Sequence, residues 1–104
     1  MRKIFWKGIS HDDRIKAVSD ITAAINNYGA IISFQKFSDI ALSLVIEIEE
    51  RKINRLYTDL KKIMIIEGIE NDFNDSPTEC IILLEITFTR GTGDLVIEVP
   101  DIPE

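Results

Sequence analysis

The hydrophobic residues of this chain follow two different periods, which alternate along the first two thirds of the sequence. Apolar and polar residues alternate one by one, a pattern that predicts β-strands, over residues 2–8 and 40–49, and a further strand is predicted over residues 30–37. Apolar residues recur every third or fourth position, a pattern that predicts amphipathic helices, over residues 13–27 and 50–64. The chain is therefore expected to mix strands with helices in a fixed order.

Each predicted helix has one apolar face. The face of the first helix is expected to consist of Ile15, Val18, Ile21 and Ile25. The face of the second is expected to consist of Ile53, Leu56, Leu60 and Ile63. Asp12 and Asp13 are good residues for the start of the first helix, because acidic groups there favour the helix dipole. Gly29 is expected to end it in the left-handed conformation.

A short fourth strand is expected within residues 67–73, after a turn at Gly68. The order is then strand–helix–strand–strand–helix–strand within residues 1–75. This order predicts an α+β fold with a ferredoxin-like βαββαβ antiparallel sheet and both helices on one face. The opposite face of such a sheet needs solvent, a partner or more of the chain to cover it. We therefore expect a homodimer.

The last third of the chain predicts a β-hairpin. A long strand over residues 78–90 is followed by glycines at 91 and 93 and by a second strand over 94–99. The first strand is apolar on both sides, which indicates burial on both sides. Residues 76–104 are thus expected to add a hairpin and a tail that extend or cover the sheet, within one domain over residues 1–104.

Composition narrows the classes of function. The chain has 18 acidic and 12 basic residues and a net charge of −6, and no Lys/Arg stripe, so nucleic acid is not an expected partner. No apolar run reaches the ~18 residues that a membrane span needs, and the basic start lacks the apolar stretch of a signal peptide. Cys80 is the single cysteine, which fits a reducing, cytoplasmic location.

The segment "FWKGISHDDRIKAVSDITAAINNYGAIIS" resembles the ACT domain family, in particular the domains of guanosine tetraphosphate synthetase/hydrolases and of amino-acid-regulated enzymes. The matching features are an apolar strand with a glycine, a polar loop with "DR", a helix with "DIT", and "YGA" before the second strand. The resemblance covers about residues 3–73. It implies a regulatory domain that pairs with a second copy and that in many members binds an amino acid at the first strand–helix loop.

This loop contains the candidate ligand-binding residues, which are Gly8, Ser10, His11, Asp12 and Asp13. Two departures from the family pattern concern the same region. The family commonly has a glycine after "DR", where this chain has Ile15, Lys16 and Ala17, and ligand-binding members often have asparagine where Ala30 stands. A ligand at this loop would direct its ammonium or hydroxyl groups toward the aspartates, because they compete with anions for the helix N–H groups.

No catalytic, metal or cofactor site is expected. His11 and its neighbouring aspartates lack the further ligands that a metal ion requires, and Cys80 within a strand is expected to be an inert thiol. The segment "RGTGD" joins two strands and does not lead into a helix, so it is not a phosphate loop. Two non-enzymatic functions stay open: a regulatory module that senses a small ligand, and an oligomerisation or protein-interaction module without one.

Overall fold

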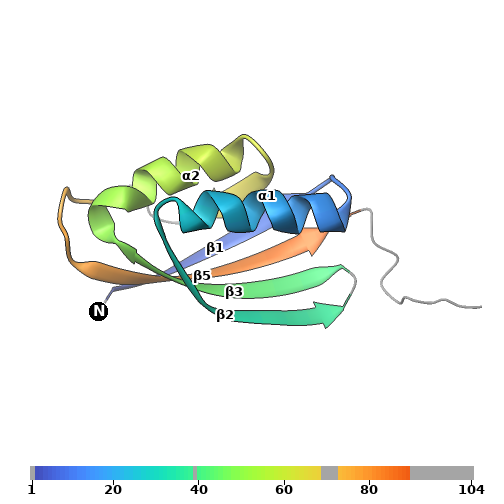
Figure 1. Cartoon of the computed structure of the whole chain (residues 1–104), viewed down its shortest axis with the longest axis horizontal. Coiled ribbons are helices and arrows are strands. Elements are labelled where there is room, and N and C mark those ends of the chain that lie inside the picture. Colours follow the sequence, from blue (N-terminus) through green and yellow to red (C-terminus); the bar gives the residue numbers. More distant parts are fainter. Residues whose placement is uncertain (1, 39, 69–72, 90–104) are drawn as a thin grey trace, which may run out of the picture.

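The computed structural model describes residues 2–38, 40–68 and 73–89. They form an α+β fold in which two helices lie on one face of a five-stranded sheet (Figure 1). The elements are, in chain order, β1 (Arg2–Ser10), α1 (Arg14–Asn26), β2 (Gly29–Ser38), β3 (Ala41–Glu49), the 3-10 turn η1 (Glu50–Lys52), α2 (Ile53–Lys61), β4 (Ile65–Gly68) and β5 (Glu79–Phe88). Both predicted helices are present, and so are the strands predicted over residues 2–8, 30–37, 40–49 and 78–90. The location predicted for the fourth strand is wrong: β4 ends at Gly68, where the sequence predicts a turn before the strand.

The position of β5 differs from the prediction. The strand order is β2-β3-β5-β1-β4, so β5 lies at the centre of the sheet, neither extending nor covering it. It runs parallel to β1 and antiparallel to β3 over its whole length, and the sheet is therefore mixed, not antiparallel. Because hydrogen bonds to β1 and β3 use both edges of β5, neither edge is free for a further strand. The second arm of the expected hairpin, residues 94–99, lies outside the described residues.

The core lies between the helices and the sheet. Alternate residues of β1, β3 and β5 face the helices and are buried, as the one-by-one alternation of β3 predicts. Side chains that are less than 2% exposed, the largest first, are Trp6, Phe88, Ile21, Ile25, Leu44, Ile46, Ile48, Ile53, Leu56, Leu60, Ile82 and Leu84. The apolar face predicted for the second helix is confirmed at three of its four positions, and the fourth, Ile63, packs at the edge of the core.

Two details of the first helical unit differ from the prediction. Ile15 is 77% exposed, and Ala17 takes the buried place next to Ile21 and Ile25. Ala17, Ile21 and Ile25 are spaced by four residues and so lie on one face, whereas Ile15 lies well away from that face. Gly29 belongs to β2 and is not left-handed; a Cβ there would lie 2.5 Å from the carbonyl oxygen of Glu47, so the close approach of β3 requires a glycine.

The second predicted helix is shorter than residues 50–64. It begins as the 3-10 turn η1 and continues as α2, which ends at Lys61. The backbone N–H groups of Glu50 and Arg51 donate to the carbonyls of Thr78 and Ser76, at 2.9 and 3.0 Å. These two hydrogen bonds join η1 to the segment that precedes β5.

Candidate functional site

The first two residues of the predicted ligand loop lie inside the fold. Gly8 is buried within β1, where an added Cβ would lie 2.7 Å from the Sδ atom of Met64. The Ser10 side chain is fully buried, and its Oγ atom accepts a hydrogen bond from the backbone N–H of Asp12 at 3.3 Å. Neither residue therefore presents a side chain to a ligand from solvent.

The other three residues of the loop take part in contacts within the chain. Asp13 caps α1, because its Oδ2 atom accepts the backbone N–H of Lys16 at 3.2 Å, as its sequence position predicts. Asp12 lies 3.8 Å from the ammonium of Lys16. The exposed His11 ring shares a hydrogen bond of 2.8 Å with the hydroxyl of Thr89, just after β5.

The loop is thus the start of α1, joined to the end of β5. The backbone N–H of Thr89 donates to the carbonyl of Ser10 at 3.0 Å, a contact between residues 79 positions apart that local sequence patterns do not predict. Ser10 and His11 contact the end of β5, Asp12 and Asp13 hold the start of α1, and Gly8 lies within β1 against Met64. Among the cavities formed by described residues alone, the one that includes Gly8 is lined by none of the other four.

The sheet face opposite the helices carries an apolar row. Phe5, Leu83 and Val45 lie side by side on β1, β5 and β3, as the strand registers require. Ile81 lies two residues before Leu83 in β5 and therefore on the same face. Phe5 is 58% exposed, and the other three side chains are partly exposed. This open face, defined by Phe5, Val45, Ile81 and Leu83, is the apolar surface that the helices leave uncovered.

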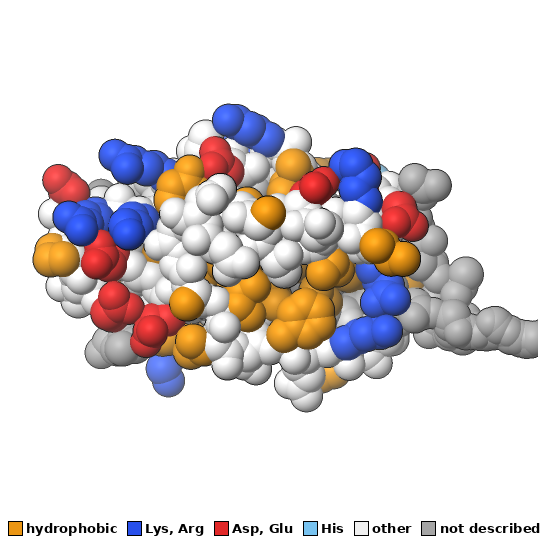
Figure 2. All heavy atoms as spheres, in the orientation of Figure 1, with side chains coloured by type: hydrophobic (Ala, Val, Ile, Leu, Met, Phe, Trp, Pro, Cys, Tyr) orange, Lys and Arg blue, Asp and Glu red, His pale blue; other side chains and the backbone are white. Residues whose placement is uncertain are grey.

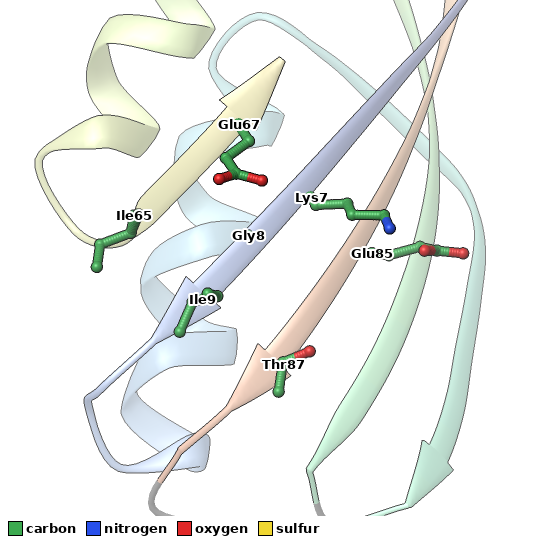
Figure 3. A pocket seen from close by; sticks show the side chains of 7 residues that line it. All are labelled: Lys7, Gly8, Ile9, Ile65, Glu67, Glu85 and Thr87. Atoms are coloured by element: carbon green, nitrogen blue, oxygen red, sulfur yellow. The ribbon is translucent and has the colours of Figure 1, made fainter. Parts of the chain in front are cut away.

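A charged row lies next to the apolar one. Lys7 of β1 stands between Glu67 of β4 and Glu85 of β5 in the strand registers. The three side chains make no ion pair among the described residues. Figure 3 shows Lys7 extending toward β5, where Glu85 lies, with Glu67 on the other side. Charges of alternating sign thus cross three strands.

The same row lines a shallow cavity of about 220 Å³. Its wall is completed by Gly8, Ile9, Ile65 and Thr87 (Figure 3). The sequence did not single out Lys7, Glu67 or Glu85 as site residues. They lie on strands up to 78 residues apart, and only the unexpected pairing of β1 with β5 brings Lys7 beside Glu85.

Two polar side chains of the interior differ in their partners. The buried Nε1 atom of Trp6 has no hydrogen-bond partner in the described part of the chain, whereas Glu50 is paired. The buried carboxylate of Glu50 accepts a hydrogen bond from Arg2 at 3.1 Å and from the backbone N–H of Asn74 at 2.8 Å. Burial raises the pKa of the Cys80 thiol, and the negative charge of Glu50 raises it further. A fully buried thiol with a raised pKa is a poor nucleophile. Within residues 2–38, 40–68 and 73–89, no cluster of His, Cys, Asp and Glu could hold a metal ion.

The chain matches no family model, and comparison with curated proteins and with solved structures found no match. No helix in the described part of the chain is long and apolar enough to cross a membrane. The site must accordingly be interpreted from the residues of this chain alone.

Proposed function

We propose that this protein is a non-enzymatic assembly module that forms a homodimer by packing its open face against the open face of a second copy. The observation that supports this function is the apolar row of Phe5, Leu83 and Val45 beside the charged row of Glu67, Lys7 and Glu85. Apolar side chains in a continuous patch favour association. Because the charged row contains both signs, the Lys7 side chain of one copy can pair with a carboxylate of the other.

The size of the whole sheet face to which the open face belongs suits this occupant. Four long strands of about nine residues give a face of roughly 19 by 30 Å, on the order of 600 Å². A stable interface takes about 800 Å² of accessible surface from each partner, and a corrugated face exposes more surface than its outline. Two such faces would form a two-layered β-sandwich with helices on its outside.

The dimer is tested by placing a charge within the apolar row. Phe5→Lys is expected to weaken dimerisation at least 30-fold, because the ammonium would be buried against apolar side chains of the second copy. Sedimentation velocity at micromolar concentration measures the change as a shift from dimer to monomer. Ile15→Lys is the matched control: it adds the same charge at a residue of α1 that is 77% exposed, and we expect it to leave the dimer unchanged.

The two outcomes that contradict the proposal are distinct. A wild-type chain that sediments as a monomer at these concentrations would remove the dimer itself. A wild-type dimer that Phe5→Lys does not weaken would place the interface elsewhere on the molecule. Because lysine lowers the net negative charge of the chain, a loss of dimer cannot be attributed to greater overall repulsion.

The fold fits a ferredoxin-like unit with one insertion. Removing β5 from the observed order leaves β2-β3-β1-β4, in which α1 connects β1 to β2 and α2 connects β3 to β4. This is the arrangement of a split βαβ pair. An ACT-like regulatory domain that acts in the cytoplasm is compatible with it, and the buried Cys80 thiol suits a reducing compartment.

The cavity beside the open face supports a second candidate, sensing of a free amino acid. The Glu67 and Glu85 carboxylates could hold an α-ammonium group, and Lys7 an α-carboxylate, within about 220 Å³. At a concentration about 100-fold above Kd, binding would add ~2.7 kcal/mol to the free energy of unfolding. We expect one amino acid to raise the melting temperature in a thermal-shift screen and Glu85→Gln to abolish the rise. A flat response to all amino acids would refute this candidate and leave the dimer untouched.

A further inference from the structure

The strand β2 forms one edge of the described sheet and presents it to solvent. Its only neighbour is β3, so the backbone N–H and C=O groups along its outer side have no strand partner within the described residues. Three large apolar side chains of β2 are half exposed or more: Ile32, Phe34 and Phe37, at 53%, 51% and 63%. Figure 2 shows hydrophobic side chains on the side of the molecule along which β2 runs in Figure 1. An edge of this kind favours addition of another strand.

The charge on this edge argues against a second copy as the added strand. Lys36 is the only charged residue among the ten of β2, and it makes no ion pair among the described residues. Pairing two β2 strands would bring together two lysines without any acidic residue. Lysine on an edge strand is a common device against such self-pairing.

The same charge favours a strand with acidic residues. Phe34 pairs with Leu44 and Lys36 with Leu42, so both side chains lie on the sheet face that bears the helices. An added strand would place its own side chains beside them at every second position. An apolar side chain suits the neighbourhood of Phe34, and a carboxylate suits that of Lys36.

We propose that the outer edge of β2 binds an extended segment of another protein as an added strand. In this segment every second side chain lies on the same sheet face as Phe34 and Lys36. These side chains are apolar except for one acidic residue, which lies beside Lys36. Backbone hydrogen bonds supply the affinity, and Phe34 and Lys36 supply the selectivity. This surface differs from the open face, so the inference goes beyond the proposed homodimer and does not depend on it.

The test uses the full chain and two short fluorescein-labelled peptides. Both peptides have valine at alternate positions with threonine between them, and the central valine is replaced by glutamate in one and by lysine in the other. We expect the glutamate peptide to bind the wild-type chain at micromolar to millimolar concentrations in fluorescence anisotropy, at least fivefold more tightly than the lysine peptide. Lys36→Glu should reverse this preference, because opposite charges across strands stabilise pairing and like charges oppose it.

Two further variants make the result specific. Lys62→Glu makes the same charge change just after α2, and we expect it to leave both affinities unchanged. Phe34→Ser should weaken both peptides at least threefold, because it removes the apolar contact that they share. None of these substitutions should change the sedimentation of the protein.

Three results would overturn the proposal. One is that the glutamate peptide does not bind the full chain at millimolar concentration. Another is equal binding by the wild-type chain and Lys36→Glu. The third is a loss of dimer in Phe34→Ser, which would assign the edge to a second copy.

Discussion

A chain shortened to residues 1–78 is expected to remain unfolded, although it keeps both helices and four of the five described strands. The shortened chain lacks β5, which lies between β1 and β3 and contributes five buried side chains: Cys80, Ile82, Leu84, Ile86 and Phe88. Burying a large apolar side chain contributes about 1.5–3 kcal/mol. The loss is comparable with the whole stability of a small domain, about 5–15 kcal/mol.

Circular dichroism and urea denaturation measure this outcome directly. The full chain should unfold in one cooperative transition, and the shortened chain should show no transition and little regular structure. The alternation of apolar residues predicts a complete unit within residues 1–75, with a hairpin added to it. Cooperative unfolding of the shortened chain would support that arrangement and would contradict a central position for β5.

The local elements of this fold follow from the sequence, whereas the order of its strands does not. Alternation in β3 predicts which residues face the helices, and the four-residue spacing of Leu56 and Leu60 predicts the buried side of α2. Strand order depends on which distant segments pair, and β1 pairs with β5 across 78 positions of sequence. Periodicity indicates which face of a strand is buried, but it does not name the distant strand with which that strand pairs.

One signal in the sequence did point to the position of β5. Its apolar residues on both sides indicate a central strand as well as a strand that meets a second layer. The same pattern also suits a contact with another sheet or subunit, so only the pairing of β5 with β1 and β3 distinguishes the two. The side bearing Cys80, Ile82 and Leu84 is buried by the helices, and the side bearing Ile81 and Leu83 belongs to the open face.

The candidate site shows the same difference between contacts of sequence neighbours and contacts of distant strands. Asp13 was recognisable as a helix cap, because capping depends on neighbours along the chain. The charged row of Lys7, Glu67 and Glu85 was not recognisable, because it requires the registers of β1 with β4 and with β5. The contact of His11 with Thr89 likewise depends on where β5 ends.

Leu84→Ala is expected to lower the free energy of unfolding by about 2–5 kcal/mol, the usual cost of truncating a fully buried leucine and leaving a cavity. Leu84 is 0% exposed, faces the helices and lies between Trp6 and Leu44 in the strand registers. With an m-value of about 1–3 kcal/mol/M, the urea midpoint should fall by roughly 1 M or more. The measurement belongs at submicromolar protein concentration, where dimerisation adds least to stability.

Leu83→Ala is the matched control, one residue away on the other side of the same strand. Leu83 lies between Phe5 and Val45 on the open face and is only partly buried, so its truncation should cost about 1 kcal/mol or less in the monomer. At higher protein concentration Leu83→Ala should weaken the proposed dimer directly, because Leu83 belongs to the open face. Leu84→Ala should reduce the amount of dimer only by reducing the amount of folded protein. Equal destabilisation by the two substitutions at low concentration would contradict the open face, because it would mean that both sides of β5 are buried within a single chain.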